Sequence, residues 1–131
     1  MDTWKVLLVD DEVEFVTTLA ERLRLRGLDA SIATDGTEAL KLIDADRPQV
    51  VVLDVLMPGL GGLAVLDQIR TTDPQIKVIL LTGRGSAQEG DRGIPQGAFD
   101  YLIKPVNIDE LIEKMREALN APSPARSGGK G

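Results

Sequence analysis

Four short, almost entirely apolar runs constrain the fold of this chain more than any other feature. They are KVLLVD (5–10), QVVVLDV (49–55), IKVILLT (76–82) and AFDYLIK (98–104). They carry β-branched residues and do not alternate between apolar and polar positions, which is typical of parallel strands buried on both faces. A weaker, alternating run, DASIA (29–33), predicts an edge strand.

Helical patterns lie between these runs. An apolar stripe over 15–23 stops at Gly27, and the acids of DGTE (35–38) predict the capped start of a second helix. Apolar residues spaced three apart over 63–69 mark a third helix, and Asn107 is the expected N-cap of the last one. Strands that alternate with helices predict an α/β fold with a doubly wound parallel sheet.

The length and composition of the chain suit one small domain. Its 131 residues are enough to bury a core, and we expect the domain to span 1–120, with a disordered tail or linker over 121–131. The net charge of −6 argues against binding to nucleic acid or to an anionic membrane. No apolar stretch approaches the roughly 20 residues of a membrane span, so the expected location is cytoplasmic.

Cysteine and histidine are both absent from the sequence. This excludes disulfides and zinc–thiolate sites, and it excludes any mechanism in which the chain uses its own histidine as a base or phosphate carrier.

Polar residues follow or end four of the predicted strands. They are Asp10 and Asp11, Asp54, Thr82 and Lys104. In open α/β sheets, ligands bind beyond the carboxyl ends of the strands, so we expect these side chains to form one site.

The residue types in this site favour phosphoryl chemistry with a metal ion. Crowded carboxylates raise one another's pKa unless a cation neutralises them, and Mg²⁺ prefers such hard oxygen ligands. Thr82 and Lys104 can bind an equatorial phosphoryl oxygen. Asp54, at the end of the strand expected to be most central, is the best candidate for a nucleophile that forms an acyl phosphate.

Four motifs give the chain a resemblance to a known family. VDDE (9–12), LDVLMPGLGG (53–62), LLTG (80–83) and DYLIKP (100–105) occur in the order and at the spacings of the receiver domain of bacterial two-component response regulators, whose members include chemotaxis regulators. The resemblance implies a flavodoxin-like sheet of five parallel strands in the order 2-1-3-4-5, with five helices.

The resemblance also implies roles for individual residues. Asp54 would be the phosphoacceptor. Asp11 and Asp54 would bind Mg²⁺ directly together with the backbone carbonyl of Leu56, and Asp10 would bind it through water.

The remaining roles concern the phosphoryl group and the switch. Thr82 and Lys104 would contact the phosphoryl group, and Tyr101 would be the aromatic residue whose rotamer follows phosphorylation. The Lys104–Pro105 peptide bond would be cis.

The family implies a signalling function for this site. The phosphoryl donor would be the phosphohistidine of a sensor histidine kinase or a phosphotransfer protein, and the domain would catalyse only its own phosphorylation and dephosphorylation. The signal would leave through the surface of helix four, strand five and helix five, toward a downstream protein or output domain that the sequence does not name.

The segment expected to hold helix four is GRGSAQEGDRGIPQG (83–97). Gly90 and Gly93 each cost roughly 1 kcal/mol against alanine in a helix, and Pro95 costs roughly 3 kcal/mol in a helix interior. We therefore expect a short helix that ends before Pro95, with little packing to offset the glycines, and the most mobile segment of the domain.

Three other functions are open. A Mg²⁺-dependent phosphohydrolase with an aspartyl nucleophile would need an acid two residues after Asp54, where the chain has Leu56. A flavin carrier of the same fold would need a loop that attracts phosphate after the first strand, where DDEVEF (10–15) is acidic. An interaction module that is never phosphorylated would not need the complete set of acids.

Overall fold

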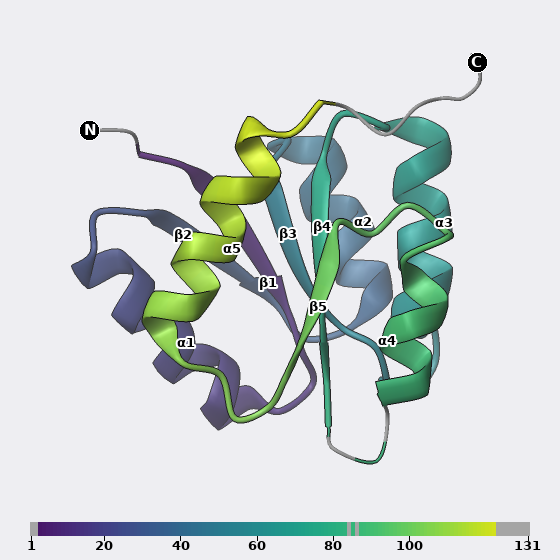
Figure 1. The fold of residues 1–131 in the computed structure, drawn as a ribbon, viewed down its shortest axis with the longest axis horizontal. Coiled ribbons are helices and arrows are strands. Elements are labelled where there is room, and N and C mark those ends of the chain that lie inside the picture. Colours follow the sequence, from purple (N-terminus) through teal and green to yellow (C-terminus); the bar gives the residue numbers. More distant parts are fainter. Residues whose placement is uncertain (1–2, 84, 86, 123–131) are drawn as a thin grey trace.

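The computed structural model describes residues 3–83, 85 and 87–122. These residues form a parallel sheet in the order β2-β1-β3-β4-β5 with helices on both faces (Figure 1), which confirms the predicted fold class and strand order. The strands are β1 (Lys5–Val9), β2 (Asp29–Ala33), β3 (Val50–Asp54), β4 (Lys77–Thr82) and β5 (Asp100–Ile103). The helices are α1 (Val13–Leu25), α2 (Gly36–Ala45), α3 (Gly62–Thr72), α4 (Ala87–Gly93) and α5 (Ile108–Asn120).

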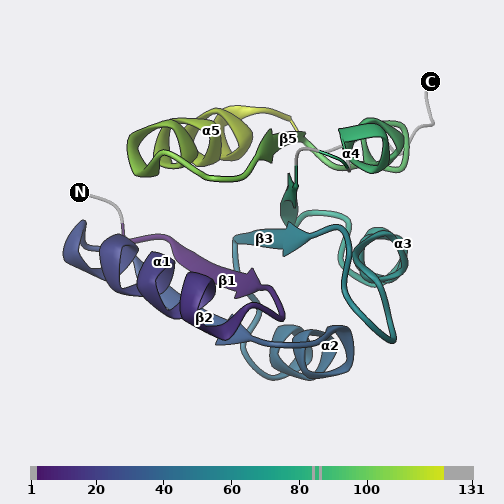
Figure 2. The same ribbon diagram turned by 90° about the horizontal axis from the view of Figure 1, so that it is seen from below.

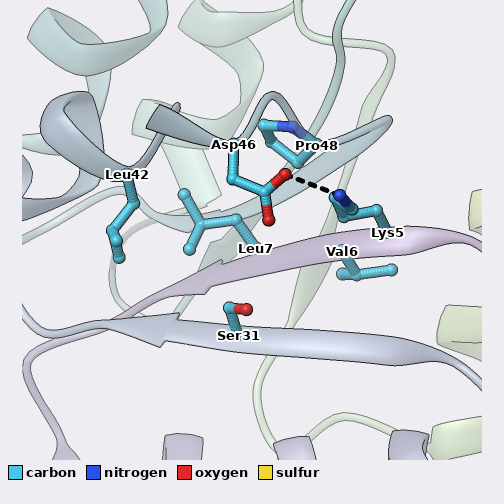
Figure 3. A pocket seen from close by; sticks show the side chains of 7 residues that line it. All are labelled: Lys5, Val6, Leu7, Ser31, Leu42, Asp46 and Pro48. Atoms are coloured by element: carbon cyan, nitrogen blue, oxygen red, sulfur yellow. Dashed lines mark hydrogen bonds and ion pairs between the residues drawn. The ribbon is translucent and has the colours of Figure 1, made fainter. Parts of the chain in front are cut away.

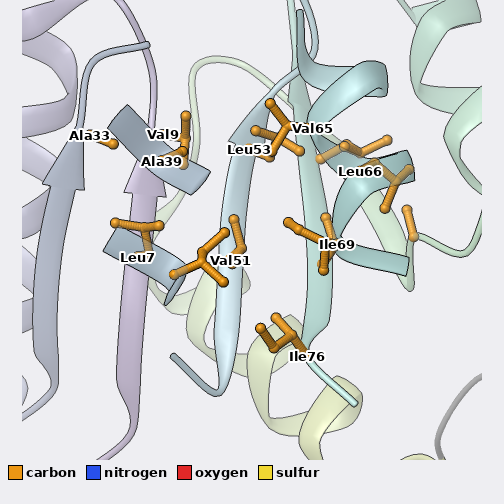
Figure 4. Packing of buried hydrophobic residues seen from close by; sticks show 14 of the residues in the cluster. Leu7, Val9, Ala33, Ala39, Val51, Leu53, Val65, Leu66, Ile69 and Ile76 are labelled. Carbon is orange, nitrogen blue, oxygen red and sulfur yellow. The ribbon is translucent and has the colours of Figure 1, made fainter. Parts of the chain in front are cut away.

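Two apolar layers hold the helices to the sheet. Figure 2 shows α1 and α5 on one face and α2, α3 and α4 on the other. Because neighbouring side chains of a strand point to opposite faces, Val6 and Leu8 of β1 pack in the layer under α1 and α5, whereas Leu7 and Val9 pack in the other layer (Figure 4). The sheet is therefore buried between two cores, as the continuous apolar runs predict.

Side-chain caps fix the start of two helices where the sequence predicts them. Asp35 Oδ1 accepts a hydrogen bond from the Glu38 N–H at 2.7 Å, and Asn107 Oδ1 accepts one from the Glu110 N–H at 3.0 Å. Each cap contributes about 1 kcal/mol, because it satisfies an N–H that has no partner within the helix.

The prediction that the run 98–104 is buried on both faces is wrong for β5. Ile103 is 43% exposed, and Leu102 is the buried residue of this strand. The physical reason is position: β5 is an edge of the sheet, as β2 is at the other edge, so it has one neighbouring strand and less cover.

Helix α4 is short and ends at Gly93, before Pro95, as predicted. Its glycines, however, are well packed, contrary to the expectation from the sequence of little packing around them. Gly90 and Gly93 are buried, and a Cβ on Gly90 would lie 2.7 Å from Cγ of Tyr101, while one on Gly93 would overlap Leu80. The missing side chains thus let α4 lie close against β4 and β5.

Two residues of the predicted tail are held by the domain. The backbone carbonyls of Ala121 and Pro122 accept hydrogen bonds from the buried Lys77 ammonium at 2.9 and 3.0 Å. The rest of the predicted tail, 123–131, lies outside the described residues. None of the helices within the described part of the chain is long and apolar enough to cross a membrane.

Glycines shape the loop between β3 and α3. Gly59 has φ +74°, a conformation that favours glycine. Gly62 begins α3 so close to β3 that a Cβ there would overlap the Asp54 carbonyl oxygen and lie 2.7 Å from Val55 Cα. The close approach of α3 fixes the backbone that carries Asp54.

We predict that Gly62→Ala lowers the free energy of unfolding by about 2 to 3 kcal/mol, because both crowded groups are backbone and cannot move aside. Gly61→Ala is the matched control, since its Cβ would lie 3.8 Å from the nearest atom, and we expect a loss below about 1 kcal/mol. Urea denaturation of the two variants measures the difference, and equal losses would contradict the packing at Gly62.

Candidate functional site

Three carboxylates converge beyond the carboxyl ends of β1 and β3. Asp10, Asp11 and Asp54 each place a carboxylate oxygen within 4.8 Å of the others. Asp10 and Asp54 are buried, and Asp11 is exposed. The two strands are direct neighbours in the sheet, with Val9 paired to Leu53, so residues 10 and 54 leave the sheet side by side.

The Asp54 carboxyl group has an unusual acidity. Burial raises its pKa to about 7, with a further increase from Asp10, while Lys104 and the Leu56 N–H act in the opposite direction. The Leu56 N–H donates to Asp54 Oδ1 at 3.4 Å, which is a long hydrogen bond. Without a further cation, this carboxyl group is only partly ionised at neutral pH.

Lys104 brings a positive charge to the acids from the end of β5. Its ammonium lies 2.8 Å from Asp10 Oδ2 and 3.8 Å from Asp54 Oδ2. Its backbone N–H donates to the Thr82 carbonyl at 2.8 Å, which anchors the residue to β4. Burial lowers the pKa of Lys104, but hydrogen bonds to Asp10 and Glu12 outweigh this effect and raise it.

Lys104 makes two further contacts that the sequence patterns did not predict. The ammonium is 2.8 Å from Glu12 Oε1, and it lies 4.7 Å from the centroid of the Phe15 ring. The adjacency of Glu12 to Asp10 and Asp11 was a signal for the first contact. The Phe15 contact has no sequence signal, because the same residue fits the apolar stripe of α1.

Thr82 and Tyr101 lie on neighbouring strands beside α4. Thr82 is fully buried, and its Oγ1 has no hydrogen-bond partner among the described residues. Leaving a buried hydroxyl without a hydrogen bond costs free energy. A ligand oxygen atom that accepts from this hydroxyl would remove that cost. Thr82 Cγ2 and Tyr101 Cγ would lie 3.0 and 2.7 Å from a Cβ at Gly90, so both residues meet α4 at one point.

The two remaining sequence-predicted features lie in the loops around the site. Leu56 follows β3, two residues after Asp54, and its side chain is 57% exposed. The Lys104–Pro105 peptide bond is cis, as predicted.

The donor set fits a small divalent cation. Three carboxylates within 4.8 Å offer hard oxygen ligands, and burial together with the neighbouring Asp10 charge raises the pKa of Asp54. A bound Mg²⁺ would supply positive charge that lowers this pKa.

A cavity lies away from the acids, at the opposite end of β1. It has a volume of about 50 Å³ and opens beside the first residues of β1, where Lys5 forms an ion pair with Asp46 at 2.6 Å (Figure 3). Its walls are Lys5, Val6, Leu7, Ser31, Leu42, Asp46 and Pro48. Asp10 and Asp11 follow the other end of β1, so this cavity has no part in the acidic site.

Comparison with known proteins agrees with the fold and identifies the family. Residues 6–116 match the family described as the response regulator receiver domain. The chain belongs to this family, and it is the receiver domain of a two-component response regulator.

The most similar proteins include response regulators of mycobacteria. The chain is 41% identical over 126 residues to "Response regulator MprA" of Mycolicibacterium vanbaalenii, which covers 96% of the chain and 54% of that protein. It is 41% identical over 120 residues to the protein of the same name from Mycobacterium avium, covering 92% and 53%. The chain thus spans about half the length of the curated relatives it matches.

Solved receiver domains share the architecture. The receiver domain of NtrX from Brucella abortus is 34% identical with a TM-score of 0.85, covering 89% of this chain and 99% of that one. The receiver domain of the Francisella response regulator 1452 is 34% identical with a TM-score of 0.81, covering 89% and 97%.

The raised pKa of Asp54 gives a prediction for stability in the absence of divalent cations. A carboxyl group whose pKa rises on folding stabilises the protein fully below its unfolded value of 3.8, and this contribution is lost as the pH rises through about 7. Asp54→Asn should therefore be more stable than the wild type at pH 8, by on the order of 2 to 4 kcal/mol, and the difference should shrink toward pH 4.

Urea denaturation in a chelator at several pH values measures this difference. Asp67→Asn, a substitution of an exposed acid on α3, is the control and should follow the wild type at all pH values. A constant difference between Asp54→Asn and the wild type from pH 4 to 8 would contradict the raised pKa.

Proposed function

We propose that this receiver domain accepts a phosphoryl group on Asp54, from the phosphohistidine of a sensor histidine kinase or a phosphotransfer protein, in a Mg²⁺-dependent reaction. The observation that carries the proposal is the position of Asp54. It is a buried carboxylate within 4.8 Å of two further acids and 3.8 Å from the Lys104 ammonium.

Asp54 is the nucleophile of the proposed reaction. One of its carboxylate oxygens attacks the phosphorus atom, the P–N bond of the phosphohistidine breaks, and its electron pair stays on the leaving imidazole. The reaction needs the ionised carboxylate, and the pKa of about 7 means that positive charge near Asp54 increases the reactive fraction at neutral pH.

Asp11, Asp54 and the Leu56 carbonyl would hold Mg²⁺ directly, and Asp10 would hold it through water. The bound ion would supply charge that neutralises the acids and the phosphoryl oxygens. The burial of Asp10 and Asp54 keeps these ligands fixed at the strand ends.

Lys104 and Thr82 bind the phosphoryl oxygens in the proposed site. The Lys104 ammonium already lies near Asp54, so it can stabilise the charge on the transferring group. The buried Thr82 hydroxyl has no partner among the residues that the structure describes, so it can donate to a phosphoryl oxygen without losing another hydrogen bond.

The proposed output follows from the contacts of Thr82. A shift of this residue toward a phosphoryl group changes the space beside Gly90, into which Tyr101 also packs. The signal then reaches the surface of α4, β5 and α5, which would contact a downstream protein or an output domain. The proposal also includes three further expectations. The receiver domain spans residues 1–120, its location is cytoplasmic, and it catalyses only its own phosphorylation and dephosphorylation.

The hydrolase alternative is weaker. It requires an acid two residues after the nucleophile, and the exposed apolar side chain of Leu56 cannot donate a proton.

Phosphorylation by a small donor tests the proposed phosphoacceptor. Incubation with acetyl phosphate and Mg²⁺ should add one phosphoryl group per chain, detected by intact-mass spectrometry. Asp54→Ala and removal of Mg²⁺ should each abolish the addition, whereas Asp67→Ala should leave it unchanged. Labelling of Asp54→Ala at the wild-type level would rule out Asp54.

Hydrogen exchange tests the proposed output. We predict that residues 87–93 exchange fastest among the described helices, because α4 is a short helix with one interior glycine, Gly90, and a glycine at its end. Beryllofluoride, a phosphoryl mimic, should change their protection in the presence of Mg²⁺. Protection equal to that of α5 and unchanged by the mimic would show that α4 does not respond.

A further inference from the structure

Glu12 is the N-cap residue of α1, but its side chain makes no capping hydrogen bond to that helix. Its Oε1 lies instead 2.8 Å from the Lys104 ammonium, 92 residues away in the sequence. The Glu12 N–H donates to Asp10 Oδ1 at 2.9 Å, which ties the backbone of Glu12 to the acidic site. The Glu12 carboxylate therefore forms an ion pair with Lys104 and does not cap α1.

Phe15, about one turn further along α1, contacts the same ammonium. The distance of 4.7 Å from Lys104 Nζ to the ring centroid is within the range of a cation–π interaction. We call the Glu12 carboxylate and the Phe15 ring the outer seat of Lys104. The Glu12 side chain is 63% exposed, whereas the side chains of Asp10 and Asp54 are 2% and 9% exposed.

We propose that Glu12 is a positioning residue that holds Lys104 on the outer seat in the unphosphorylated domain and competes with the phosphoryl group for it. This inference rests on the proposed phosphorylation of Asp54. The ammonium is within hydrogen-bond distance of Asp10 and Glu12, but at 3.8 Å it is beyond that distance from Asp54. A phosphoryl group on Asp54 would attract the ammonium toward Asp54, and the attraction of Glu12 for the same ammonium opposes that shift.

The exposure of Glu12 sets the strength of this competition. An exposed ion pair is weak, so the outer seat holds Lys104 in the resting protein but yields to the greater charge of a phosphoryl group. Removing the charge of Glu12 should therefore favour the phosphorylated arrangement by a small factor.

Binding of beryllofluoride with Mg²⁺ measures the competition. Glu12→Gln should bind the mimic roughly two- to fivefold more tightly than the wild type, which is the range of an exposed ion pair. Glu14→Gln is the matched control, because it removes an equal charge from the first turn of α1 and its residue forms no ion pair in the described part of the chain. Equal effects of the two substitutions would overturn the proposal.

Substitution of Lys104 shows whether Glu12 acts through the Lys104 ammonium or only through its negative charge near the site. In a Lys104→Met background, Glu12→Gln should change the affinity for beryllofluoride no more than Glu14→Gln does. An advantage of Glu12→Gln that persists without the ammonium would show that Glu12 acts by another route and would contradict the proposal.

Denaturation distinguishes failure of this inference from failure of the proposed function. In a chelator and without phosphate, the wild type, Glu12→Gln, Lys104→Met and the double variant form a cycle that reports the Glu12–Lys104 coupling. Favourable coupling supports the outer seat, and zero coupling overturns it, whether or not the protein binds beryllofluoride. A wild type that binds no beryllofluoride would contradict the proposed function. The cycle would still show whether Glu12 and Lys104 interact in the unphosphorylated domain.

Discussion

Negative charge crowded at the carboxyl end of a buried sheet is the constraint on which the rest of this structure depends. Asp10 directly follows β1, and Asp54 is the last residue of β3. The two residues cannot move apart, because β1 and β3 are hydrogen-bonded neighbours. Burial and repulsion raise the pKa of Asp54 to about 7, and the Lys104 ammonium only partly compensates. Because ionisation of Asp54 is unfavourable without a cation, a metal ion that binds beside it favours the ionised carboxylate.

The fold supplies this constraint through packing on both faces of the sheet. The apolar layers hold β3 in the centre, and the close approach of Gly62 to the Asp54 carbonyl and Val55 fixes the backbone just after the nucleophile. On the other side of the site, Gly90 lets α4 rest against Tyr101 and Thr82. Rigid packing thus surrounds Asp54, whereas the element expected to respond is a short helix that includes two glycines.

Much of this arrangement could be predicted from the sequence, because it depends on local patterns. Continuous apolar runs indicate buried strands, and the polar residues that follow them must meet at one edge of a parallel sheet. The exposure of Ile103 was missed because the apolar run alone suggests burial on both faces, although the strand order implied by the resemblance places this strand at an edge of the sheet. The outer seat was only partly predictable: the adjacency of Glu12 to Asp10 and Asp11 pointed toward Lys104, but Glu12 could also cap α1, and only the three-dimensional position of Lys104 decides between these roles.

Coupling between Mg²⁺ binding and the ionisation of Asp54 tests directly whether this carboxylate governs the site. Titration calorimetry at pH 7, in buffers of different ionisation enthalpy, gives both the affinity and the number of protons released. We expect the wild type and Asp67→Asn to release roughly half a proton per Mg²⁺, because a group with a pKa of about 7 is half protonated there. Asp54→Asn should bind Mg²⁺ more weakly and release no proton. Equal affinity and equal proton release in Asp54→Asn would contradict the central role of this carboxylate.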